Sequence, residues 1–269
     1  MEIYDDEYLD QFISAKFIEI GAAGAGASDY FSEVGNDLFP ERLIVSNEDD
    51  VAGLQAKIAR VDYLFVITDI EDLKIAESVA KIIEESKIFL TTFGILCPSA
   101  DDVRLADIQK KFGTWIILPR DKIAESGFTK NAAIYRAVNM TTSIIPIMKK
   151  RANFIGMDFA EIPRTIGNFG KACIGFGESL DTENPALDAV KKALKSPLFI
   201  EDIRHAKKTL LVFFGKIEFL NMLQMNEAAT FLDELMYPAD DWRCLLQVDV
   251  DETAADGVTA FIFATNFEK

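Results

Sequence analysis

The first half of the chain alternates short apolar runs with amphipathic stretches, from residue 16 to about residue 120. The apolar runs are rich in β-branched and aromatic residues, which favour strands. Because these runs are continuous and are separated by helical stretches, they predict a parallel sheet covered on both faces. Right-handed crossovers would make it a doubly wound sheet. The predicted strands are Lys16–Ile20, Arg42–Ser46, Tyr63–Thr68, Lys87–Phe93 and Thr114–Leu118.

The second half follows a different order of elements. A long helical pattern runs from about Thr129 to Lys150, with Pro146 as a kink or local break. After Asp158 the pattern reads strand, helix, strand, helix, strand, strand, and the last two strands flank the turn-like ETAADG. This order predicts a smaller α+β subdomain with a mixed sheet. The predicted organisation is an α/β chain with an extension at 1–15, a Rossmann-like subdomain at 16–128, a central helix at 129–155 and the α+β subdomain at 156–269.

Composition and charge narrow the function classes. The chain has 269 residues, of which 49% are hydrophobic, and 44 acidic residues against 28 basic ones give a net charge of -16. Such a charge repels phosphate backbones, so nucleic acid is not an expected partner. Cys97, Cys173 and Cys244 lie far apart in apolar stretches, which predicts buried free thiols and no metal site. The acidic start and the lack of an apolar run of about 20 residues predict a cytoplasmic location.

A glycine-rich segment follows the first predicted strand. It reads GAAGAGAS over Gly21–Ser28 and opens a predicted helix, where backbone N–H groups and the helix dipole can hold a phosphate. Its GxxGxG spacing differs from both the dinucleotide and the P-loop fingerprints. Two interpretations stay open, an anion-binding loop or a strand-to-helix turn built from small residues.

Several motifs together resemble FtsZ, the bacterial relative of tubulin. Three segments of the second half match in order, and the final strand VTAFIFATNF continues the likeness: GMDFAEI at Gly156–Ile162, NPALDAVKKALKSPLF at Asn184–Phe199 and MNEAATFLDEL at Met225–Leu235. In the first half, IILPRDK at Ile116–Lys122 resembles the family motif IVIPNDK, and YRAVN at Tyr135–Asn139 resembles the start of its central helix. The resemblance spans residues 16 to 267 and implies a GTPase-type subdomain joined by the central helix to an activation-type subdomain.

The resemblance implies a site for GTP or GDP. The first loop would contribute Gly21, Ala22, Gly24 and Gly26. Asn47, after the second strand, matches an Asn of the family site, although Glu48 replaces the Thr beside it. Tyr135 and Asn139 match the positions that stack on and read guanine, and being four apart they share one helix face. Equally, Tyr135 could be an interface aromatic and Asn139 a solvated polar residue.

The family signature GGGTGTG is absent from the segment after the third strand. That segment reads TDIEDLKIAESVAK over Thr68–Lys81 and contains no glycine. Asp69, Glu71 and Asp72 stand where phosphates would approach, which predicts electrostatic repulsion. These acids could also cap the next helix, or bind a divalent cation that holds a nucleotide.

An acidic pair lies near the end of the central helix. In FtsZ filaments the matching loop reaches into the neighbour's nucleotide site, so the resemblance implies that Asp158 and Glu161 would act as catalytic carboxylates in trans. Their spacing is also that of a capping box, which could serve only to start a helix. A second glycine motif of this chain, GFGES at Gly175–Ser179, is expected to form a turn at a strand end.

The leading hypothesis is a self-assembling, cytoskeleton-like protein with a degenerate GTP site and impaired catalysis. Head-to-tail contacts between copies would build open filaments. A role in membrane remodelling or a division-related assembly is expected, with an unidentified membrane-associated adaptor as a further partner. The alternative is a GTPase that hydrolyses GTP at subunit interfaces of a filament. A nicotinamide-dependent oxidoreductase is disfavoured by the GxxGxG spacing.

Overall fold

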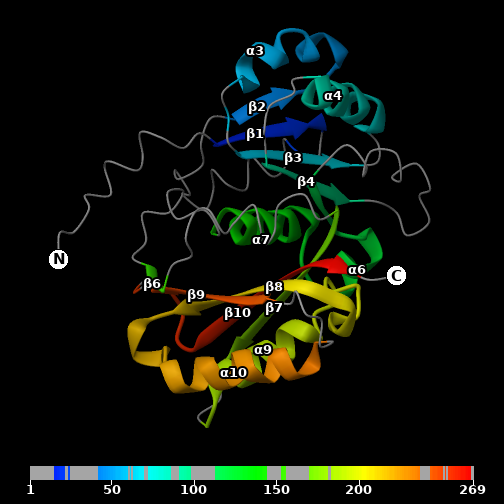
Figure 1. The fold of residues 1–269 in the computed structure, drawn as a ribbon. Coiled ribbons are helices and arrows are strands. Elements are labelled where there is room, and N and C mark those ends of the chain that lie inside the picture. Colours follow the sequence, from blue (N-terminus) through cyan, green and yellow to red (C-terminus); the bar gives the residue numbers. More distant parts are fainter. Residues whose placement is uncertain are drawn as a thin grey trace, which may run out of the picture. The chain divides into compact units, whose positions relative to one another are not determined.

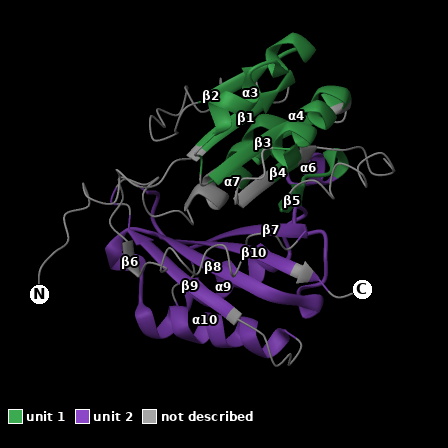
Figure 2. Cartoon of the chain, turned by 45° about the horizontal axis from the view of Figure 1, so that its top comes forward, with its two compact units in different colours: residues 1–121, 128–150 green, residues 122–127, 151–269 purple. Residues whose placement is uncertain are grey.

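The computed structural model describes most of two compact units of the chain (Figures 1 and 2). Unit 1 comprises residues 1–121 and 128–150, and unit 2 comprises residues 122–127 and 151–269. The described residues are 15–21, 24, 42–59, 61, 63–69, 72–85, 91–97, 113–143, 153–155, 170–180, 183–236, 243–250, 252 and 254–267.

Unit 1 is built on a parallel sheet. Its strands run in the order β2-β1-β3-β4-β5. Neighbouring strands pair in register, and the rings of Phe17 and Phe65, paired residues of β1 and β3, stack with centroids 4.7 Å apart. The strands are β1 (Ala15–Ile20), β2 (Arg42–Val45), β3 (Tyr63–Asp69), β4 (Thr91–Cys97) and β5 (Thr114–Ile117).

Helices lie on both faces of this sheet, as predicted (Figure 1). On one face, α3 and α4 enclose a core that includes Ile18, Leu64 and Val79, all fully buried. The central helix α7 lies on the other face, and Thr129 starts it by accepting a hydrogen bond from the amide of Ala132 at 3.1 Å. The helices are η1 (Glu48–Val51), α3 (Leu54–Ile58), α4 (Leu73–Glu85) and α7 (Lys130–Ser143). Helix α6 (Arg120–Glu125) begins in unit 1 and continues into unit 2.

One strand of unit 1 lies later than the sequence predicts. The expected strand was Lys87–Phe93, whereas β4 runs from Thr91 to Cys97. Its pairing with β3 joins Tyr63 to Thr91 and Asp69 to Cys97, so the neighbouring strand sets its position. The apolar stretch begins before this strand, at Ile88, and ends with it at Cys97. Hydrophobicity alone therefore did not fix the bounds of the strand.

Unit 2 carries a mixed sheet, as predicted, in the order β7-β10-β8-β9-β6. Strand β10 is antiparallel to β7 and β8, β8 and β9 are parallel, and β6 is antiparallel to β9. Helices α9 and α10 pack on one face over a buried apolar core. The elements are β6 (Asn153–Ile155), β7 (Gly170–Ser179), α9 (Pro185–Leu194), η5 (Ile203–His205), β8 (Ala206–Gly215), η6 (Ile217–Phe219), α10 (Met222–Leu235), β9 (Arg243–Val250) and β10 (Val258–Phe267).

The GFGES motif is part of strand β7, so the expected turn was wrong. Its glycines allow α9 to approach the strand backbone. A Cβ atom on Gly175 would lie 2.3 Å from the carbonyl oxygen of Ala193, and one on Gly177 would lie 2.2 Å from that of Ala189. The glycines are therefore required by helix-to-strand packing and not by a turn conformation.

No helix in the described part of the chain is long and apolar enough to span a bilayer.

Candidate functional site

The candidate site lies at the edge of the unit 1 sheet where the parallel strands end. Strand β1 leads into Gly21, β3 ends at Asp69, and Arg120 follows β5 as the first residue of α6. In open α/β sheets, ligands bind outside the carboxyl ends of the strands. The fold thus brings the glycine-rich segment, the acidic segment and the IILPRDK motif to the same edge.

The described glycines of the first loop have conformational reasons to be glycine. Gly21 has φ of 62°, in the left-handed region. Gly24 is buried, and a Cβ atom there would lie 2.5 Å from the backbone carbon of Glu19. Both observations fit an anion loop and a tight turn equally well. Ala22 and Gly26 lie outside the described residues.

The carboxylate of Asp72 lies directly against this loop. A Cβ atom on Gly21 would be 1.9 Å from Oδ2 of Asp72 and 2.0 Å from its Cγ. Asp72 immediately precedes Leu73, the first residue of α4. A carboxylate therefore lies at the start of the loop for which phosphate binding was one of the two interpretations.

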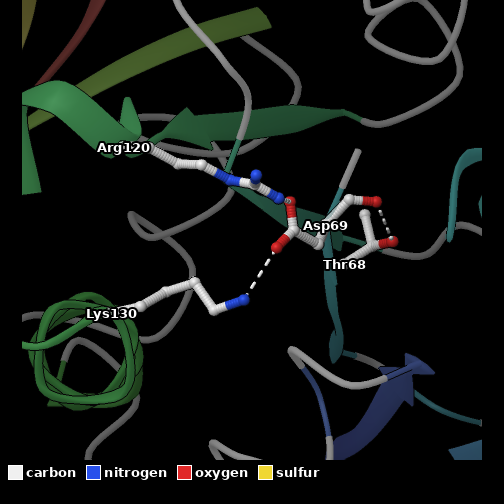
Figure 3. A network of polar contacts seen from close by, with 4 residues as sticks. All are labelled: Thr68, Asp69, Arg120 and Lys130. Atoms are coloured by element: carbon white, nitrogen blue, oxygen red, sulfur yellow. Dashed lines mark hydrogen bonds and ion pairs between the residues drawn. The ribbon is translucent and has the colours of Figure 1, made fainter. Parts of the chain in front are cut away.

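Asp69 forms a two-cation network at the end of β3 (Figure 3). Its Oδ1 accepts a hydrogen bond from Nη2 of Arg120 at 2.7 Å, and its Oδ2 accepts one from Nζ of Lys130 at 2.8 Å. The side chain of Asp69 is 2% exposed, whereas those of Arg120 and Lys130 are each 37% exposed. The carboxylate is therefore buried and is paired with two cations of unit 1.

This network gives Asp69 a role that the sequence analysis did not foresee. The expected roles were repulsion of phosphate, capping of the next helix and binding of a divalent cation. In the structure the Asp69 carboxylate binds Arg120 and Lys130. One signal was present in the sequence, since Arg120 stands where the family motif IVIPNDK has Asn. Lys130 gave no comparable signal, because its proximity to Asp69 depends on where α7 begins.

Asn47 caps the short helix η1. Its Oδ1 accepts hydrogen bonds from the amides of Asp49 at 2.9 Å and Asp50 at 3.2 Å. The carboxylate of Asp50 accepts in return from the amide of Asn47 at 3.1 Å, which completes a capping box. The Oδ1 atom thus has a structural role, and a role in binding the nucleotide stays a prediction.

Tyr135 lies on α7 and is half-buried. The buried face of this helix is formed by Ala133, Ile134, Ala137 and Val138, all fully buried. Asn139 belongs to α7, although its side chain lies outside what the structure describes. Asp158 and Glu161 also lie outside the described residues. The guanine-reading and catalytic roles of these residues stay predictions.

The thiols of unit 2 are free and shielded. Cys173 is buried, Cys244 is partly buried, and neither forms a disulfide. Burial raises the pKa of Cys173 to about 12, and burial together with the Asp233 carboxylate raises the pKa of Cys244 as well. Both stay protonated near neutral pH, and a protonated thiol is a poor nucleophile and a poor metal ligand.

Comparison by sequence finds relatives among the FtsZ proteins. No protein-family model matches the chain. The chain is 28% identical to the cell division protein FtsZ of Helicobacter pylori over 173 residues, which is 61% of this chain and 44% of that protein. It is 32% identical to FtsZ 1 of Thermococcus kodakarensis over 118 residues, 41% of this chain and 31% of that protein. The chain thus spans less than half the length of the curated relatives it matches.

Comparison by structure finds the same fold along nearly the whole chain. FtsZ of M. jannaschii, solved as the W319Y mutant, superposes with a TM-score of 0.78 at 20% identity over 97% of this chain and 93% of that one. A GTPγS-bound protofilament of CetZ2 from Haloferax volcanii gives 0.73 at 11% identity, over 96% and 94%. GDP-form protofilaments of TubZ from Bacillus thuringiensis serovar israelensis give 0.71 at 13% identity, over 98% and 91%. The predicted α/β fold and the predicted likeness to FtsZ are confirmed.

Proposed function

We propose, from the premise that this chain is a divergent member of the tubulin/FtsZ superfamily, that it assembles head to tail into filaments with weak or no nucleotide binding. Support for assembly comes from relatives with the same fold, since CetZ2 and TubZ were solved as protofilaments. A heterologous contact of this kind repeats without closing unless the rotation between subunits forms a ring.

The observation that carries the degenerate-site part of the proposal is the position of two carboxylates. Asp72 contacts Gly21 at the start of the first loop, and Asp69 occupies the cations Arg120 and Lys130. The segment Thr68–Lys81 contains no glycine that could offer its backbone amide to a terminal phosphate. A triphosphate would have to displace or neutralise both carboxylates before it could bind.

The remaining parts of the nucleotide site belong to the same proposal. Tyr135 and Asn139 would face the base of GTP or GDP, and Asn47 would lie beside the loop edge. Asp158 and Glu161 of one copy would approach the site of the next, where the longer side chain of Glu161 retains base chemistry but alters its reach. With binding weakened, we expect impaired hydrolysis.

We place the filament in the cytoplasm, in membrane remodelling or a division-related assembly. The net charge of -16 opposes direct binding to anionic lipid. A membrane-associated adaptor would therefore link the filament to its membrane.

Sedimentation and electron microscopy of the concentrated chain, with and without GTP and magnesium, test the proposal. We expect pelletable polymer in both conditions, because assembly should not depend on nucleotide. A particle that stays monomeric at all concentrations would contradict assembly. Polymer that forms only with GTP would retain assembly but contradict the degenerate site.

A functional GTPase is the second candidate. The described glycines of the first loop are compatible with it, since Gly21 has a positive φ and a Cβ atom on Gly24 would lie 2.5 Å from the backbone carbon of Glu19. In that case phosphate release should rise steeply with protein concentration, because each copy completes the site of its neighbour. Absence of saturable GTP binding at millimolar concentration would exclude this candidate.

A further inference from the structure

We propose that Arg120 and Lys130 form an oxyanion-binding site that the chain fills from within, with the Asp69 carboxylate as its resident anion. The inference rests on the altered nucleotide site of the proposed function and deepens it. In this inference the two cations are already bound to an anion of the chain itself, and the site neither stands empty nor only repels phosphate.

The geometry is that of a bound oxyanion. Each oxygen of Asp69 contacts a different cation, Oδ1 to Arg120 at 2.7 Å and Oδ2 to Lys130 at 2.8 Å. These are the short, charge-assisted contacts that Arg and Lys make to a carboxylate or a phosphate. Arg120 is the first residue of α6, and Lys130 is the first residue of α7. The Asp69 carboxylate therefore connects the end of β3 to the starts of two helices.

The order of burial distinguishes this arrangement from an ordinary surface ion pair. The side chain of Asp69 is 2% exposed, whereas those of Arg120 and Lys130 are each 37% exposed. The network holds one negative and two positive side chains, in a chain whose net charge is -16. Removal of the carboxylate would leave two adjacent cations that attract an external anion.

Asp69, Arg120 and Lys130 lie where an open parallel sheet binds its ligands. They lie at the carboxyl end of β3 and beyond β5. A second carboxylate, that of Asp72, contacts Gly21 at the same edge. Two carboxylates from one short segment thus cover the two places at this edge where an oxyanion would be held.

Thermal unfolding with added anion tests the inference on the intact chain. We would compare the wild type with Asp69→Ala and Asp69→Asn, in inorganic phosphate up to about 50 mM, with potassium chloride holding ionic strength constant. Without phosphate, Asp69→Ala should lower Tm by roughly 5–10 °C, because two partly buried cations lose their partner. Phosphate should restore a large part of that loss in Asp69→Ala and leave the wild-type Tm unchanged.

Two further variants make the result specific. Asp188→Ala removes a carboxylate of unit 2 that is hydrogen-bonded to Ser179 at 2.5 Å and paired with Lys192 at 2.7 Å, and phosphate should not rescue it. The triple variant Asp69→Ala, Arg120→Gln, Lys130→Gln should also lose the rescue, because the cations are gone. If Asp69→Ala fails to fold, Asp69→Asn provides the same comparison, since its amide keeps the shape and loses the charge.

Equal phosphate shifts in the wild type and the Asp69 variants would overturn the inference, as would an equal rescue of Asp188→Ala. The double variant Asp69→Ala, Asp72→Ala extends the test, with GTP and magnesium in place of phosphate. Its apparent affinity for GTP should exceed that of the wild type by roughly tenfold or more. These measurements report ligand binding, whereas sedimentation reports assembly, so a failure of one does not imply a failure of the other.

Discussion

The strand-end edge of unit 1 and the helix-covered face of unit 2 differ in how they use polar and small residues. In unit 2, Gly175 and Gly177 let α9 lie against β7. The side chain of Asn184 caps the start of that helix by accepting a hydrogen bond from the amide of Leu187 at 3.0 Å. These features hold secondary structures together. At the edge of unit 1, Asp69 is buried with two cations, and Asp72 contacts Gly21. These residues of unit 2 are the scaffold side of the comparison, and the residues at the edge of unit 1, where open parallel sheets bind ligands, are its ligand side.

The largest expected effect breaks the scaffold side of this comparison. Gly177→Ala would place a methyl group 2.2 Å from the carbonyl oxygen of Ala189, so α9 must move away from β7. We expect a loss of about 3 kcal/mol or more in the free energy of unfolding, measured by urea denaturation. The control is Gly170→Ala, where φ of 75° causes strain but no atom lies within 4 Å. Its cost should be about 1 kcal/mol, and equal costs would contradict the packing argument.

The next effect sharpens the ligand side. Gly21→Ala should cost roughly 2–3 kcal/mol, because the new methyl group meets Asp72 and φ is positive. In an Asp72→Ala background the same change should cost only about 1 kcal/mol, since the positive φ alone remains unfavourable. A double-mutant cycle by denaturation measures the difference. Strict additivity would show that Asp72 does not press on the loop.

A smaller effect tests the helix start in unit 2. Asn184→Ala removes the acceptor for the Leu187 amide and the donor to Glu227 Oε2 at 2.9 Å. The expected loss is about 1 kcal/mol, as for other helix caps. Asn221→Ala, which removes the corresponding cap of α10, should cost a similar amount. Hydrogen exchange should show faster opening in the first turn of the affected helix and not in unit 1.

The smallest effect concerns pH. The hydrogen bond from the Arg204 side chain lowers the pKa of Asp202 to about 2. A carboxyl group whose pKa is lower in the folded state stabilises the protein at pH values above its unfolded pKa, about 4. That contribution is lost as pH falls from about 4 through 2, and the partial exposure of the pair limits it to less than about 1 kcal/mol. Asp202→Asn should flatten the stability curve in this window, and an unchanged slope would contradict the assignment.

Much of the fold was readable from the sequence because burial leaves a pattern. The continuous apolar run of β3 predicted a strand buried on both faces, and all of its residues are buried. The ends of β4 were not readable, since its position depends on the register with β3. GFGES was misread for a related reason, because the close approach of α9 to β7 is a property of packing between elements.

The candidate site was readable only in part. The glycine-rich segment, the acidic segment and IILPRDK each gave a local signal, and the parallel sheet brings all three to one edge. The contact of Asp69 with Arg120 and Lys130 spans 51 and 61 residues of sequence. Charges so far apart give no pattern that periodicity can detect. Repulsion of phosphate, helix capping and cation binding were therefore the expected roles, and the ion pairs of Asp69 with Arg120 and Lys130 were not predicted.

The buried carboxylate of Asp69 has a consequence for timing. A phosphate group on a bound nucleotide can be cleaved and released. Its release makes the change from the state before hydrolysis to the state after it irreversible. Asp69 is part of the polypeptide and cannot be released. In the proposed filament this anion could not provide an irreversible step, and subunit turnover would follow protein concentration, partner binding or degradation.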